Sequence, residues 1–99
     1  MATLHIEHPI SDLATWLGAF NKFEEARKRA GVRAQRVWQP ADDDKYIYIA
    51  LDFDSADQAS AFKSFLETNV WASEVASPAL VGTPTARVLV DVGRDAVTP

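Results

Sequence analysis

Cysteine is absent from this chain of 99 residues. Its absence excludes disulfide bonds, thiolate metal sites and cysteine nucleophiles. Long apolar runs are also missing: no stretch approaches the roughly 18 residues that a membrane-spanning helix needs, and residues 1–8 lack the basic start and apolar core of a signal peptide. We therefore expect a soluble, cytoplasmic protein.

Positive charge is scarce as well. Ten Lys and Arg residues against 14 Asp and Glu residues give a formal net charge of −4. Proteins that bind nucleic acid or anionic membranes usually carry a basic face. The sequence also has neither a glycine-rich phosphate loop nor a nucleophile elbow. We expect neither nucleic acid nor membrane as a partner.

The most regular stretch is residues 46–53, which read Tyr-Ile-Tyr-Ile-Ala-Leu-Asp-Phe. Side chains of a strand point to alternate faces. The odd-numbered residues form an apolar face, whereas the even-numbered ones include two tyrosines and an aspartate. The pattern predicts a central strand whose apolar face packs against helices.

The rest of the chain supplies three further strands and two amphipathic helices. Alternation predicts strands at residues 3–7, 32–39 and 86–92, the first of them stopped by Pro9. Helical periodicity follows Ser11 as an N-cap and runs to residue 30, with Gly31 as the C-terminal glycine. A second helix follows a Ser55–Gln58 capping box, and a helical turn is expected at residues 70–76.

The order strand, helix, strand, strand, helix, strand predicts an α+β, ferredoxin-like βαββαβ fold. Four antiparallel strands would then carry two helices on one face. At this length the chain forms one domain, which we place at residues 1–93, and residues 94–99 are expected to be a frayed tail.

The sheet face away from the helices is expected to be aromatic and partly polar. Large exposed apolar patches usually mark interfaces or ligand sites, and symmetric dimers are the commonest oligomers. We therefore expect a homodimer closed through this face. The face is expected to hold His5, Tyr46, Tyr48, Ala50, Asp52, Arg87, Leu89 and Asp91, together with Arg36 and Trp38.

Core and turn positions along nearly the whole chain carry a resemblance to a known group of proteins. These positions are His5; Ser-Asp-Leu at 11–13 with Trp16 and Phe20; Arg-Ala-Gly-Val at 29–32; Ile-Ala-Leu-Asp-Phe-Asp-Ser at 49–55 with Ala59 and Phe62; and Val-Gly-Thr-Pro at 81–84. The pattern resembles the dimeric α/β-barrel superfamily, which includes the antibiotic biosynthesis monooxygenase-like proteins. The resemblance implies a fold more firmly than an activity, because members of this superfamily catalyse unrelated reactions.

The oxygenase branch implies a cofactor-independent monooxygenase or cyclase-like enzyme that acts on an aromatic, polyketide-type molecule. His5 is the candidate base, because an unperturbed imidazole titrates near neutrality. Arg36, Trp38 and Tyr48 would orient an aromatic oxyanion, and Trp71 would lie at the pocket rim or across a dimer interface. The alternative is a non-catalytic dimer that binds a small ligand or is purely structural, with His5 paired to Glu7, Asp91 or a backbone carbonyl.

No cofactor or metal is expected. The haem-degrading branch implies an asparagine on the first strand, a tryptophan in the second half and a downstream histidine ligand, and only Trp71 fits this pattern. The two histidines of the chain, His5 and His8, lie three residues apart. On one strand they would point to opposite faces, so a shared ion is not expected.

Overall fold

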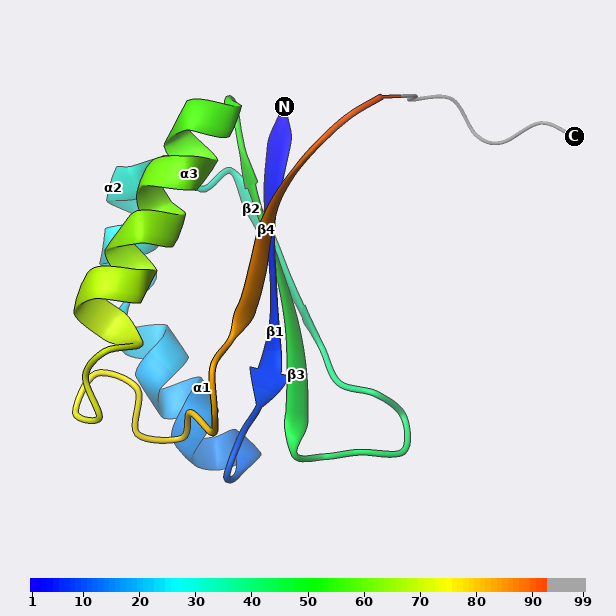
Figure 1. Cartoon of the computed structure of the whole chain (residues 1–99), viewed down its shortest axis with the longest axis vertical. Helices are drawn as coiled ribbons and strands as arrows, with labels where there is room; N and C mark the ends of the chain where they lie inside the picture. The colour runs from blue at the N-terminus through cyan, green and yellow to red at the C-terminus, as the bar shows by residue number, and fades with distance from the viewer. Residues whose placement is uncertain (93–99) are drawn as a thin grey trace, which may run out of the picture.

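A computed structural model describes residues 1–92 of the chain. Its strands form one antiparallel sheet in the order β2-β3-β1-β4, and all helices cover the same face of that sheet (Figure 1). The predicted ferredoxin-like α+β fold is confirmed. The elements in chain order are β1 (Ala2–Pro9), α1 (Leu13–Lys22), α2 (Glu24–Ala30), β2 (Ala34–Trp38), β3 (Tyr46–Phe53), α3 (Ala56–Phe65), the π-helical turn η1 (Leu66–Val70) and β4 (Thr85–Val90).

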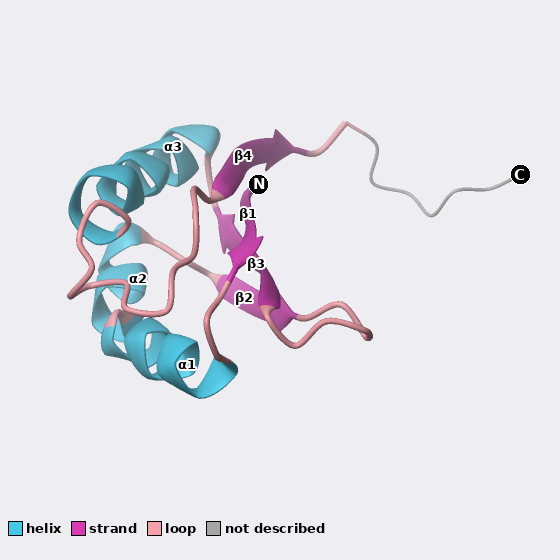
Figure 2. Cartoon of the chain, turned by 60° about the horizontal axis from the view of Figure 1, so that its bottom comes forward, coloured by secondary structure: helices cyan, strands magenta, loops and turns pink. Residues whose placement is uncertain are grey.

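The central strands β1 and β3 alternate between buried and half-exposed side chains, as their sequences predict. Leu4, Ile47 and Phe53 are fully buried beneath the helices. The helix-facing side of the sheet is therefore the core, whereas the opposite side, here called the open face, has no covering element within residues 1–92 (Figure 2). No helix among those residues is long and apolar enough to span a membrane.

The first predicted helix is broken into α1 and α2 at Phe23. The Phe23 N–H bonds the Phe20 carbonyl at 3.2 Å, three residues back. The same carbonyl accepts a hydrogen bond from the Arg27 guanidinium. A side chain thus occupies an acceptor that the backbone would bond in an unbroken helix. The sheet therefore carries three α-helices instead of the two expected. The N-cap of α1 also differs from the prediction: it is Asp12 instead of Ser11, and the Asp12 carboxylate accepts a hydrogen bond from the Thr15 N–H at 2.8 Å.

Several strand boundaries also differ from their predictions. Strand β1 runs past the predicted end at residue 7 and includes Pro9 as its last residue. Pro9 lies opposite Tyr46 of β3, whereas the pairing with β4 ends earlier, at Glu7. Proline has no N–H to donate, and at a strand end without a partner on that side this costs little stability. The edge strands are shorter or shifted: β2 spans five residues and β4 ends at Val90. The expected tail at 94–99 lies outside the described residues.

Helix α3 continues directly into the π-helical turn η1, which ends at Val70. The helical turn predicted for residues 70–76 is wrong, because residues 71–76 form turns without a helix. The Trp71 N–H bonds the Leu66 carbonyl at 2.7 Å, five residues back. The wider turn buries Leu66 and Val70 and leaves Trp71 half-buried. Such π-turns occur frequently at functional sites.

Gly31 ends α2 in the left-handed region, with φ of 98°. An added Cβ would also lie 2.9 Å from the Gln58 amide nitrogen. We expect Gly31→Ala to lower the free energy of unfolding by about 1–2 kcal/mol, because a side chain in this backbone conformation is strained. Urea denaturation measures the loss. Gly18→Ala is the control: Gly18 lies within α1 with no atom near its Cβ position, and alanine there should stabilise.

A candidate ligand-binding cavity between the sheet and the helices

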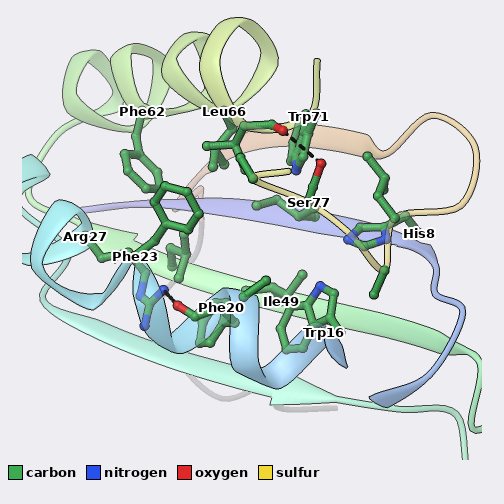
Figure 3. Close-up of a pocket in the computed structure, with 17 residues that line it drawn as sticks. His8, Trp16, Phe20, Phe23, Arg27, Ile49, Phe62, Leu66, Trp71 and Ser77 are labelled. Carbon is green, nitrogen blue, oxygen red and sulfur yellow. Dashed lines mark hydrogen bonds between the residues drawn. The ribbon is translucent and has the colours of Figure 1, made fainter. Parts of the chain in front are cut away.

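A cavity of about 80 Å³ lies between the sheet and its helices (Figure 3). It is bounded by β1, β3, all three helices, η1 and the segment that leads to β4. The lining is mainly apolar and aromatic, with a few polar groups, which is the composition typical of small-molecule sites. The residues around it are Ile6, His8, Trp16, Ala19, Phe20, Phe23, Arg27, Ile49, Leu51, Phe62, Leu66, Val70, Trp71, Ala76, Ser77, Ala79 and Leu80.

His8 brings a basic nitrogen to this cavity. Its side chain points to the helix side of β1 and is 3% exposed. Nδ1 lies 2.8 Å from the Pro9 carbonyl oxygen, and because a carbonyl can only accept, Nδ1 must carry the proton. In the neutral ring Nε2 is then an unprotonated acceptor. Burial lowers the pKa of His8, partly offset by the hydrogen bond to Pro9, so the ring is neutral at pH 7.

The Nε2 atom of His8 is accessible from the cavity. No acceptor or donor among the described residues pairs with it. Yet none of the described side chains has a polar atom that is both sealed from solvent and unpaired. Nε2 must therefore reach open space, and the cavity is the space that His8 lines.

Two tryptophans and a serine accompany His8 at one end of the cavity (Figure 3). Trp16 is stacked on Phe20 with ring centroids 4.7 Å apart, and Trp71 is presented by the π-helical turn. Neither indole N–H has an acceptor within the described part of the chain, so both are available to a ligand. Ser77 is already engaged, because its hydroxyl is 2.8 Å from the Val70 carbonyl and 2.7 Å from the Ser73 carbonyl.

Arg27 lies at the other end, beside Phe20, Phe23 and Phe62 (Figure 3). It is only 4% exposed, and its guanidinium carbon is 3.7 Å from the centre of the Phe20 ring. Nε donates to Gln35 Oε1 at 2.9 Å. Burial lowers the pKa of Arg27, with an opposing effect from Glu24, but a guanidinium remains charged in proteins. The cavity therefore has a histidine end and a cationic end.

The structure does not bring the five predicted site residues together. Trp71 lines the cavity, whereas His5, Arg36, Trp38 and Tyr48 belong to the open face on the other side of the sheet. Strand pairing fixes this arrangement, since Arg36 lies opposite Ala50 and Ala50 opposite His5. A single cavity of one chain does not contain all five residues.

The open face instead carries its own polar and aromatic contacts. The Tyr46 hydroxyl donates to Glu7 at 3.0 Å, and this hydrogen bond raises the pKa of Tyr46. His5 Nδ1 is 3.9 Å from the other Glu7 oxygen. The Tyr46 and Tyr48 rings lie 5.3 Å apart. His5 thus lies within ion-pair distance of Glu7, one of the partners that the alternative interpretation names.

The pleat of β1 keeps the two histidines on opposite faces, as predicted from their spacing. Within residues 1–92, no cluster of three or more His, Asp or Glu side chains has metal-binding geometry.

Sequence reasoning missed His8 and Arg27 as cavity residues. The alternation of β1 places His8 on the helix side, and that signal was present in the sequence. Arg27 lies in a basic run, residues 27–29, at the end of a helix, which is typical of a solvated surface. Its spacing, seven residues after Phe20 and four after Phe23, nevertheless places it on the buried face of the helix, so helical periodicity was a signal for Arg27 as well.

Comparison with known proteins supports the fold. No protein-family model and no curated protein sequence matches the chain. Solved structures do match. A Nitrosomonas europaea protein named as a candidate antibiotic biosynthesis monooxygenase is 17% identical, with a TM-score of 0.67 over 94% of this chain and 100% of that one. The chain has the fold of the antibiotic biosynthesis monooxygenase-like proteins.

Two further solved structures share this fold. SnoaB, a cofactor-independent oxygenase from Streptomyces nogalater, is 16% identical, with a TM-score of 0.62 over 99% of this chain and 97% of its own. A dimeric ferredoxin-like protein from an uncultured marine organism is 8% identical, with a TM-score of 0.62 over 98% and 100% of the two chains. At such identities the likeness concerns the fold.

Proposed function

We propose that this protein is a cofactor-independent monooxygenase that oxidises a phenolic, polyketide-type aromatic molecule in the cavity between its sheet and helices. The observation that carries the proposal is His8: its ring holds the proton on Nδ1, and the unprotonated Nε2 is open to an aromatic cavity. A base of this kind can remove a proton from a phenol or from the acidic carbon of an aromatic ketone. The likeness to a cofactor-independent oxygenase fold supports the same activity.

The reaction needs molecular oxygen as its only co-reactant. His8 Nε2 takes a proton from an activated CH₂ group, and the resulting carbanion bonds one oxygen atom of O₂. The protonated His8 returns its proton to the peroxide that forms. Loss of water then breaks the O–O bond and leaves a carbonyl, so that R₂CH₂ and O₂ give R₂C=O and H₂O. Atoms and electrons balance without flavin or metal.

The remaining cavity residues bind and orient the substrate. The Trp16 and Trp71 indoles offer N–H donors beside His8, suited to a developing oxyanion. The phenylalanine rings at the other end provide flat apolar walls. A cavity of about 80 Å³ is smaller than a typical drug-sized site of roughly 300 Å³ or more. We infer that one ring of the substrate occupies it, and that a larger molecule displaces the segment that carries Ser77.

An oxygen-electrode assay with an anthrone as substrate tests this proposal. Purified protein stripped of metals by chelation should consume one O₂ for each quinone formed, well above the rate of the buffer alone. Binding of the anthrone without faster oxygen uptake would contradict the oxygenase and support the alternative, a non-catalytic protein that binds an aromatic ligand.

We further propose that the working unit is a homodimer closed through the open face. This face combines half-exposed aromatic rings with exposed apolar side chains at its edges, including Trp38 at 43% and Leu89 at 47% exposure. Rings with polar edges are enriched in protein interfaces. The dimeric state of a protein with the same fold supports this assembly.

We expect Leu89→Lys to weaken the dimer at least tenfold, because it would bury an unpaired ammonium in the interface. Sedimentation equilibrium over a range of protein concentrations measures the change. The control is Val75→Lys: Val75 is 92% exposed in the segment between η1 and β4 on the helix side of the sheet (Figure 2). Equal dissociation constants for the two variants would contradict an interface on the open face.

A further inference from the structure

Arg27 is a buried cation without a carboxylate partner. Among the described residues, ion pairs form between His5 and Glu7, Lys28 and Glu24, Arg33 and Asp54, and Lys63 and Glu67. Arg27 forms none, although it is the only buried Lys or Arg side chain among the described residues. Its protein acceptors are neutral, namely the Phe20 carbonyl and the Gln35 amide. A buried charge is usually paired, so an unpaired one indicates a counter-ion from outside the chain.

The Arg27 guanidinium retains donors for such a counter-ion. It has five N–H groups, and the two hydrogen bonds to protein use one on Nε and one on Nη1. Nη2 has no acceptor in the described part of the chain. No unpaired side-chain nitrogen or oxygen of the described residues is sealed from solvent. Nη2 must therefore be accessible from open space. A planar fork of this kind matches the two oxygens of a carboxylate.

Arg27 borders two spaces rather than one. It lines the aromatic cavity, and it also lines a cleft of about 190 Å³ between α2 and β2. Two more basic residues, Lys28 and Arg33, line this cleft, against a single carboxylate from Glu24. The apolar cavity and the basic cleft thus meet at one side chain. An elongated ligand that is apolar at one end and anionic at the other would match both.

We propose that the aromatic ligand of this protein carries a carboxylate, and that Arg27 binds it where the cavity meets the α2–β2 cleft. The inference rests on the proposed aromatic ligand of the cavity, but it does not depend on turnover. It makes Arg27 the residue that selects acidic aromatic molecules over neutral ones of the same shape. Lys28 and Arg33 lie at the outer side of the same site, where the ion pairs with Glu24 and Asp54 offset their charge, so the selecting cation is Arg27.

The test compares benzoate with benzyl alcohol, which share a ring and differ in charge. Titrations followed by amide NMR shifts should give a dissociation constant for benzoate about tenfold lower or more, the factor expected for one charge-assisted contact. Arg27→Met should remove this preference and retain binding of benzyl alcohol. Arg29→Met is the control, because Arg29 is an exposed cation of α2 that lines neither space.

A second variant keeps the inference testable if Arg27→Met fails to fold. Gln35 is exposed on β2 and already accepts from Arg27, so Gln35→Glu should supply an internal carboxylate and abolish the preference for benzoate. Asn21→Asp adds the same charge on α1 and should leave the preference intact. A preference that survives Gln35→Glu would overturn the role of Arg27. Failure of both probes to bind would overturn the aromatic cavity itself.

Discussion

Replacing His8 by glutamine is expected to lower the rate of substrate oxidation by about 10²–10⁴-fold, the usual contribution of a general base. Glutamine keeps the approximate size of the side chain and can donate to the Pro9 carbonyl, but it cannot accept a proton at pH 7. Substrate affinity should change much less than turnover. Single-turnover measurements of oxygen uptake separate the two quantities.

The matched control is His5→Gln on the same strand. His5 is the base expected from the sequence, but its side chain lies on the open face beside Glu7. If catalysis takes place in the cavity, His5→Gln should leave the rate within about threefold of the unchanged protein, an effect small on the scale of a lost general base. A large loss for His5→Gln together with a normal rate for His8→Gln would move the reaction to the open face.

The pH dependence provides a second readout of His8. Its pKa in the folded state lies below the ordinary value of 6.5 because of burial. Above 6.5 the ring is neutral in both the folded and the unfolded chain, and its contribution to stability is fully present. As the pH falls from 6.5 through the lowered pKa, the unfolded chain binds the proton more readily, so the free energy of unfolding decreases. Both the rate and this part of the stability should fall in that window, and His8→Gln should flatten both.

Replacing Phe53 by alanine is expected to lower the free energy of unfolding by about 3–5 kcal/mol. Phe53 is fully buried, and its ring lies 5.9 Å from that of Phe62. Removing the ring would leave a void between β3 and α3 that close-packed neighbours cannot fill. A small domain is stable by only about 5–15 kcal/mol, so the variant should be close to unfolding. Urea denaturation at fixed protein concentration measures the loss.

Phe65→Ala is the comparison for this variant. Phe65 also packs against Phe62, at 5.6 Å between ring centroids, but it is partly exposed. Its loss should therefore cost less than half as much, since a partly exposed ring recovers water contacts and leaves no sealed cavity. Equal losses for the two variants would show that β3 and α3 are not the centre of the core.

The sequence by itself determined the sheet and its two faces. Alternation along residues 46–53 depends only on the geometry of a strand, so the burial of Ile47 and Phe53 could be deduced without any tertiary contact. The same parity places His5 and His8 on opposite faces. The order of helices and strands then left few topologies open, because sequential elements pack side by side.

Only the tertiary structure decided where the candidate site lies. A cavity depends on how well the helices fill the space above the sheet, and periodicity contains no information on that fit. Helical spacing places Arg27 on the buried face of α2, but its partner Gln35, which accepts a hydrogen bond from Arg27 Nε, belongs to β2. This contact forms only when α2 is packed beside β2 of the sheet. Local sequence determined which faces are apolar, and long-range packing determined which polar groups those faces enclose.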